Sequence, residues 1–155
     1  MAELSFDALP AQGALLALDP GAKTIGVAVC DPTRLIASAL VTITRTKLAQ
    51  DAARIFALYD ERACTALVVG LPLNMDGSEG PRAQSARALA RNLLGIRDVP
   101  LLFADERLTT AGAERALLEA DASRARRKEV IDAAAAAWLL QGVVDRLRHA
   151  NPEMG

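Results

Sequence analysis

Apolar and polar positions follow two different rhythms along this chain, and the first rhythm covers residues 14–44. There, short apolar or β-branched runs alternate with Gly, Pro and Asp, a pattern that favours strands and turns. The links between the runs are short, whereas parallel neighbours would need a long crossover. We therefore expect an antiparallel meander of three strands, over residues 14–19, 24–29 and 35–44.

Beyond residue 46, apolar residues recur three or four positions apart, which is the period of an amphipathic helix. Predicted helices cover residues 47–62, 82–94, 109–120 and 128–148. Two fully apolar runs between them, at 66–71 and 100–104, predict buried strands, and we expect a polar, Arg-rich link at 121–127. Strands that alternate with helices join a sheet in parallel. The sequence therefore predicts an α/β fold with a five-stranded mixed sheet, three antiparallel strands and then two parallel ones, flanked by helices.

Chain length and composition indicate one folded domain. The 155 residues suit a single core, and 52% apolar against 24% charged residues are typical of a globular chain rather than a disordered one. We expect the domain to span residues 14–148, with a flexible N-terminal tail at 1–13 and a C-terminal tail at 149–155. Aromatic residues make up only 3% of the chain, so stacking of bases on aromatic rings is not expected to dominate nucleic-acid binding.

Charge, cysteine usage and hydropathy narrow the class of protein further. A net charge of −1 argues against an extended basic interface, but it permits an enzyme with a local basic rim around an acidic centre. Cys30 and Cys64 are far apart and lack metal-ligand spacing, so they indicate small buried hydrophobes in a reducing compartment. The N-terminus has no signal-peptide pattern, and the apolar run at 131–144 is too short and too polar to span a bilayer. We expect a cytoplasmic protein without membrane contact.

Three acidic residues fall where an α/β sheet usually places its site. Asp19 ends the first predicted strand and Glu106 follows the fifth, and sites gather at the carboxyl ends of such strands. Asp132 lies among apolar residues of the last predicted helix, where a carboxylate is costly unless it is paired or bound to a metal. Carboxylates of this kind suit Mg²⁺ or Mn²⁺, and a pair of such ions can drive in-line displacement at phosphate. The three acids are thus candidate metal ligands and catalytic residues.

Each of these acids also has a structural interpretation. Asp19 precedes Pro-Gly and suits a turn, Glu106 can pair with a neighbouring arginine, and Asp132 suits the N-terminal part of its helix. Single acids at the ends of elements are more often structural than catalytic. The hypothesis of a metal centre therefore depends on all three acids meeting at one place.

Polar and basic residues in the loops and in a basic run are candidates for substrate binding. A glycine turn at 20–24, a loop rich in turn formers at 70–82 and a basic run at 124–128 suit phosphate contacts, but they suit solvated links as well. If the basic run contacts phosphates, binding will weaken steeply with salt. His149 lies in the predicted tail and is not expected to be catalytic. The candidate substrate-binding residues are Lys23, Asn74, Arg82, Arg107, Thr109, Arg126, Arg127 and Lys128.

Four motifs occur together and in order over nearly the whole predicted domain: ALDPGAKTIGVAV (17–29), VVGLPLNMDGSEGPR (68–82), DERLTT (105–110) and RRKEVIDAAAAAWLLQG (126–142). By these motifs the chain resembles the YqgF/RuvX family of pre-16S rRNA nucleases and Holliday junction resolvase-like proteins. The resemblance implies an RNase H-like fold and a metal-dependent nuclease site, with Asp19, Glu106 and Asp132 in the positions of the family's acids. It also implies trimming of the 5′ end of the 16S rRNA precursor during ribosome assembly, and hence structured RNA and the pre-ribosomal particle as partners.

The resemblance has one gap, in the last predicted helix. Related resolvases place two acids there, but positions 135 and 136 are both Ala, and Glu129 stands where the family usually has Lys or Gly. Asp105 and Glu129 are therefore the spare candidates for a fourth ligand.

Other functions remain open from the sequence. A Holliday junction resolvase acting on branched DNA would normally need a two-fold dimer, so both a monomer and a homodimer are compatible with the chain. A non-catalytic nucleic-acid-binding factor in ribosome assembly would keep the fold without needing the acids. An actin-like ATP-binding domain shares a DPG-type phosphate turn, but such proteins pair two related domains and this chain has room for one.

Overall fold

The computed structural model describes residues 9–10, 12–105 and 124–150, with side chains for residues 9–10, 12–105 and 133–148. The strands are β1 (Ala14–Pro20), β2 (Thr24–Cys30), β3 (Ala37–Thr44), β4 (Cys64–Leu71) and β5 (Leu101–Asp105). The helices are α1 (Leu48–Glu61), α2 (Pro81–Ile96) and α4 (Arg124–Ala150). Glu106, Arg107 and Thr109, together with the helix expected at 109–120, lie outside the described residues.

The strands form a five-stranded mixed sheet in the order β3-β2-β1-β4-β5. β1 pairs antiparallel with β2, and β2 pairs antiparallel with β3. β4 joins the other side of β1 in parallel, and β5 joins β4 in parallel after the crossover through α2. The prediction of three antiparallel strands followed by two parallel strands is therefore confirmed.

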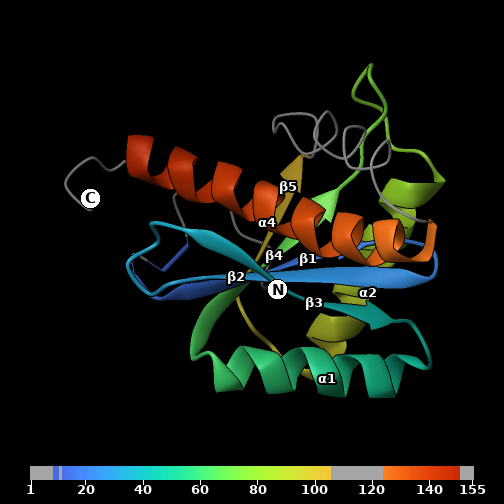
Figure 1. The fold of residues 1–155 in the computed structure, drawn as a ribbon, viewed down its shortest axis with the longest axis horizontal. Coiled ribbons are helices and arrows are strands. Elements are labelled where there is room, and N and C mark those ends of the chain that lie inside the picture. Colours follow the sequence, from blue (N-terminus) through green and yellow to red (C-terminus); the bar gives the residue numbers. More distant parts are fainter. Residues whose placement is uncertain (1–8, 11, 106–123, 151–155) are drawn as a thin grey trace.

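Helices cover both faces of the sheet, so the domain has three layers (Figure 1). α1 and α2 pack on one face, in a core that includes Leu16 and Leu18 of β1. α4 covers the other face, where several strand positions are alanine, among them Ala17 and Ala28. These small side chains allow the α4 backbone to approach the sheet closely. Leu9, within the predicted N-terminal tail, is buried in the same α4-side core.

Several element boundaries differ from the prediction by one or more residues, and two of these differences have a local explanation. β3 begins at Ala37 rather than at residue 35. The backbone N–H groups of Leu35 and Ile36 donate to the Asp31 carboxylate, so they do not serve a neighbouring strand. The last helix begins at Arg124, so part of the link expected at 121–127 belongs to α4, because Arg, Ala and Lys are good helix formers. None of the helices in the described part of the chain has the length and hydropathy needed to cross a bilayer.

Candidate active site

Asp19 lies at the carboxyl end of β1 and is only 6% exposed. Strand alternation places its side chain on the face covered by α4, because Ala17 belongs to the α4-side core. Asp19 pairs with Gly26 of β2, and the register of β1 with β4 places Gly70 on its other side. Glycines on both neighbouring strands remove the side chains that would otherwise flank the carboxylate within the sheet. This is the end of the sheet where sites form in α/β proteins.

The β1–β2 turn that follows Asp19 is held by main-chain and arginine contacts. The Gly21 N–H donates to the Thr24 carbonyl at 2.8 Å and closes the turn. Arg45 Nη1 donates to the Gly21 carbonyl at 2.8 Å, and the Arg45 N–H donates to the Lys23 carbonyl at 2.9 Å. The turn therefore presents the exposed Lys23 from a fixed backbone at the Asp19 end of the sheet. Sequence reasoning missed Arg45, since nothing local marks an arginine that bonds to a turn so far away in the sequence.

β5 brings a second acid, Asp105, to the same end of the sheet but to the opposite face. Asp105 pairs with Leu71 of β4, and Leu71 belongs to the core under α1 and α2. Cross-strand partners share a face, so Asp105 projects to the side away from Asp19. Asp105 is therefore not placed to share an ion with Asp19. Glu106 follows it in the sequence and lies outside the described residues.

α4 carries the backbone of the third predicted acid. Asp132 lies four residues before Ala136 and seven before Leu139, and both of these are buried in the α4-side core. The helix thus runs over the face of the sheet to which Asp19 belongs. The predicted substrate-binding and spare-ligand residues Arg126, Arg127, Lys128 and Glu129 are in the first part of the same helix. Their side chains and that of Asp132 lie outside the described residues.

The described side chains supply one of the three predicted metal ligands. Within that part of the chain, no three His, Cys, Asp or Glu side chains group closely enough to hold a metal ion. Glu106 and the Asp132 side chain are outside it, so the meeting of the three acids stays a prediction. Asp19 itself fits a cation ligand, because it is a nearly buried carboxylate at a strand end and carboxylate oxygens are ligands that divalent cations prefer.

The loop between β4 and α2, residues 72–80, begins at the Asp19 end of the sheet. Its tip is a tight turn in which the Gly77 N–H donates to the Asn74 carbonyl and the Asn74 N–H donates to the Ser78 carbonyl, both at 2.9 Å. The Asn74 amide also donates to Ser78 Oγ at 3.0 Å, so this predicted substrate-binding residue helps to hold the turn. Arg82 is exposed in the first turn of α2, at the end of the loop.

Arg87 of α2 fastens the far end of this loop. Its Nε donates to Glu79 Oε1 at 2.7 Å, and its guanidinium lies 4.8 Å from the centre of the Phe103 ring in β5. The hydrogen bond from Arg87 lowers the pKa of Glu79. One arginine of α2 therefore contacts both the loop and β5, a role that the sequence did not reveal because these two partners lie on separate segments.

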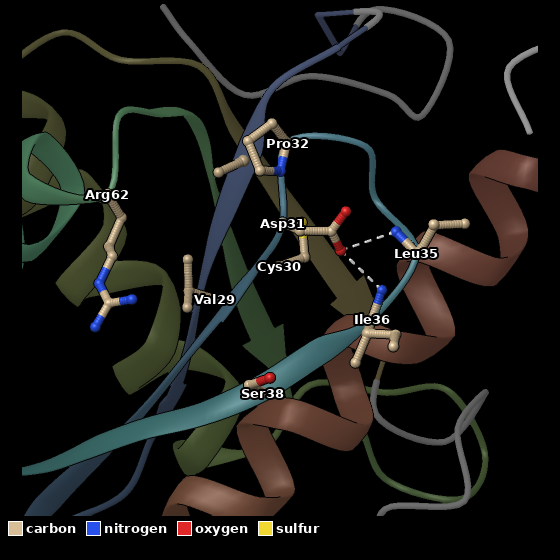
Figure 2. A pocket seen from close by; sticks show the side chains of 9 residues that line it. Val29, Cys30, Asp31, Pro32, Leu35, Ile36, Ser38 and Arg62 are labelled. Carbon is tan, nitrogen blue, oxygen red and sulfur yellow. Dashed lines mark hydrogen bonds between the residues drawn. The ribbon is translucent and has the colours of Figure 1, made fainter.

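A cavity of about 550 Å³ lies at the other end of β1 and β2, away from Asp19 (Figure 2). Its lining residues are Ala14, Val29, Cys30, Asp31, Pro32, Leu35, Ile36, Ser38 and Arg62. Asp31 is the one acid among them, and its carboxylate accepts the backbone N–H groups of Thr33, Leu35 and Ile36 at 2.9 to 3.1 Å. The hydrogen bond from the Ile36 N–H, followed by that from the Thr33 hydroxyl and then that from the Leu35 N–H, lowers the pKa of Asp31 to about 2. Asp31 therefore has a structural role in this cavity, because its carboxylate stabilises the loop to which it belongs.

Arg34, in the same loop, is a second structural residue that the sequence did not indicate. It is 2% exposed, with a φ of 58° in the left-handed region, and its Nε donates to the Gly13 carbonyl at 2.8 Å. Its Nη2 has no hydrogen-bond partner within the described ranges, and burial lowers the pKa of this guanidinium. Cys30 is buried, as predicted; burial raises the pKa of its thiol, whose sulfur accepts the Leu15 N–H at 3.3 Å. The Arg34 bond therefore joins the loop to the residue before β1, and the Cys30 bond joins the end of β2 to β1.

Comparison with known sequences finds close relatives along nearly the whole chain. A family model described as "RuvX: Holliday junction resolvase" matches residues 13–146. A relative from Cereibacter sphaeroides is 59% identical over 147 residues, covering 95% of this chain and 92% of the relative. A relative from Paracoccus denitrificans is 58% identical over 146 residues, covering 94% and 92%. Both relatives carry the name "Putative pre-16S rRNA nuclease".

Solved structures of resolvases share the fold at low sequence identity. Thermus thermophilus RuvC in complex with a Holliday junction substrate matches with a TM-score of 0.53 and 15% identity, over 87% of this chain and 96% of that one. The yeast mitochondrial Holliday junction resolvase Ydc2 matches with a TM-score of 0.54 and 12% identity, over 96% and 86%. These likenesses show the RNase H-like fold that the motifs implied. With the family model and the relatives covering most of its length, the chain belongs to the RuvX family.

Proposed function

We propose that this chain is a divalent-metal-dependent nuclease that hydrolyses phosphodiester bonds and acts on the 5′ end of pre-16S rRNA. The observation that carries the proposal is the nearly buried Asp19 carboxylate at the carboxyl end of β1, flanked by glycines and facing the side of α4. The choice of substrate is supported by the name "Putative pre-16S rRNA nuclease", which is given to a relative that is 59% identical over most of the chain. Pre-ribosomal RNA as substrate also agrees with a cytoplasmic location.

Asp19, Glu106 and Asp132 would hold Mg²⁺ or Mn²⁺ in this proposal. When bound, such ions supply a water activated for attack and stabilise the charge of the leaving oxygen. Asp19 is held by the pairing of β1 with both neighbouring strands, so its carboxylate needs no large motion to serve as a ligand. Position 132 lies four and seven residues before the buried Ala136 and Leu139, and this helical spacing supports its assignment as a ligand.

Basic residues at the same end would hold the phosphate backbone. Lys23 and Arg82 are both exposed there, on the β1–β2 turn and on the first turn of α2. Arg126, Arg127 and Lys128 add a basic run in the first part of α4. Because the net charge of the chain is −1, this attraction is local, and affinity should fall as the salt concentration rises.

A second candidate function is resolution of Holliday junctions in DNA. The description of the matching family model and the fold shared with RuvC favour it. Symmetric cleavage of a four-way junction needs two sites related by a two-fold axis, so this function predicts a dimer on the substrate. Pre-rRNA cleavage has no such requirement.

The test is cleavage of two substrates by the full chain: an RNA containing the 5′ leader of pre-16S rRNA, and a four-way DNA junction. We expect the leader to be cut when Mg²⁺ or Mn²⁺ is present and left intact with EDTA. Metal addition should also raise the melting temperature of the protein, because cations relieve repulsion among the acids. Cleavage of the junction alone would favour the second function.

If neither substrate is cleaved while the RNA is still bound, both enzymatic functions are contradicted and the protein is a nucleic-acid-binding factor. The control for loss of a carboxylate outside the proposed site is Asp98→Asn, which removes an exposed carboxylate between α2 and β5. This variant should cleave and bind metal like the unaltered protein.

A further inference from the structure

The loop at 72–80 shows one large apolar side chain to solvent at the proposed active end. Met75 is 91% exposed, the highest value among the large hydrophobic residues of the described part, where Ile36 follows at 66%. Figure 1 shows this loop standing beyond the carboxyl ends of β4 and β5, far from α1. β4 is the neighbour of β1, whose carboxyl end carries Asp19. The exposed methionine therefore lies at the end of the sheet where the proposed cleavage takes place.

The backbone on both sides of Met75 is fixed by hydrogen bonds. In addition to the bonds between Asn74 and Ser78, the Ser78 N–H and hydroxyl both donate to Asp76 Oδ1, at 2.9 and 2.6 Å. Gly77 closes the turn with a φ of 89°, a conformation that favours glycine. The side chains of Asn74, Asp76 and Ser78, together with Gly77, thus hold the backbone of the turn, and the Met75 side chain stays exposed.

Nucleic acid offers apolar surface mainly on the faces of its bases. Proteins that kink or open nucleic acid often insert Met, Leu, Ile, Phe or Pro at a base step. Among the described aromatic residues, Phe56 and Tyr59 are buried, the Arg87 guanidinium lies over the ring of Phe103, and Trp138 lies on α4 rather than on the loop at 72–80. Methionine is flexible and polarisable, so it can adapt to any base face without reading sequence.

We infer that Met75 inserts against base faces of the bound nucleic acid beside the phosphate to be cut and unstacks one base step. The inference rests on the proposed nuclease function and adds the kind of substrate feature that this end of the protein selects. Unstacking costs least at a helix end, a bulge, a mismatch or a branch point. Basic residues such as Lys23 and Arg82 position the backbone, while Met75 selects a step that opens easily.

The test measures unstacking directly, in the Asp19→Asn background so that binding occurs without cleavage. The probe is the pre-16S leader RNA with 2-aminopurine at successive positions, since fluorescence of this base rises when it leaves the stack. We expect a rise at one or two neighbouring positions on binding. Adding Met75→Ala should abolish the rise and weaken binding roughly tenfold, as expected for loss of one buried side chain. The dependence of affinity on salt should not change, because phosphate contacts remain.

Two variants serve as controls. Met75→Leu should keep the fluorescence rise, because it preserves an apolar side chain of similar size. Ile96→Ala removes another exposed apolar side chain, 53% exposed at the end of α2, and should change neither signal. If the fluorescence rise is the same with Met75→Ala as without it, the inference is overturned and the nuclease proposal is left intact. If the Asp19→Asn protein binds neither the RNA nor a four-way DNA junction, the nuclease proposal fails and this inference with it.

Discussion

The two ends of the β1–β2 hairpin each carry an aspartate, and the surroundings of the two carboxylates differ in origin. Asp31 is bound by N–H groups that lie two to five residues away in the sequence, so its loop organises itself. Asp19 lies between the adjacent strand β2 and the sequence-distant strand β4, on the face of the sheet that is covered by the sequence-distant helix α4. The carboxylate of Asp31 stabilises its own loop, whereas we propose that the carboxylate of Asp19 serves as a metal ligand.

The sharpest test of this contrast is Asp19→Asn, which keeps the size of the side chain and removes its charge. We expect cleavage to fall on the order of 10³- to 10⁴-fold, as for loss of a central catalytic carboxylate. Single-turnover cleavage and thermal unfolding measure this. The melting temperature without metal should stay close to that of the unaltered protein, and its rise on adding Mg²⁺ should disappear. Cleavage at the original rate would show that Asp19 is structural and would remove the difference between the two ends.

Asp31→Ala should have the opposite profile, with cleavage retained and stability lost. Three backbone N–H groups lose their carboxylate acceptor, which should lower the free energy of unfolding by about 1–2 kcal/mol at neutral pH. The pKa of Asp31 is lowered from 3.8 to about 2, so its charge stabilises the fold above pH 4, and this contribution is lost as the pH falls towards 2.

Urea unfolding at a series of pH values checks this second prediction. The difference between Asp31→Ala and the unaltered protein should shrink between pH 4 and pH 2. A difference that stays constant across this window would mean that the charge of Asp31 does not support its loop.

The smallest expected effect concerns the contact between α4 and the Asp31 loop. Gln141 of α4 accepts the Ala37 N–H at 2.9 Å and donates to the Leu35 carbonyl at 3.1 Å. Gln141→Met removes both bonds, together with the exposed bond from Gln141 to Asp145, and should cost about 1 kcal/mol of unfolding free energy in urea titration, with cleavage nearly unchanged. A loss of cleavage larger than this loss of stability would show that the Asp31 end sets the geometry of the Asp19 end, and the contrast between them would fail.

The sheet could be predicted because its strands are short apolar runs between Gly and Pro, a signal contained within each segment. The place of Asp19 at a strand end followed from the same signal, and the structure confirms it. Contacts between distant segments could not be predicted, since Arg45, Arg87 and Arg34 look like ordinary surface arginines in the sequence. The sequence also could not predict on which face of the sheet Asp105 lies, because this depends on the register of β5 with β4.

Met75 marks a different limit of sequence reasoning. Turn formers around it predicted the loop correctly, yet they gave no reason to expect an apolar residue at its tip. A lone large hydrophobe among residues that already satisfy a turn is the signal that could have found it.

The alanines between α4 and the sheet constrain how this domain can diverge. Ala17 and Ala28 set the depth at which the helix rests, and Ala17 lies only two residues before Asp19. Exchange of Ala17 for valine would push α4, the helix that bears position 132, away from the sheet. If Asp19 and Asp132 hold ions together as proposed, this exchange would separate the two acids without altering either one, and we expect bulkier residues in this layer only together with a compensating loss of volume on α4.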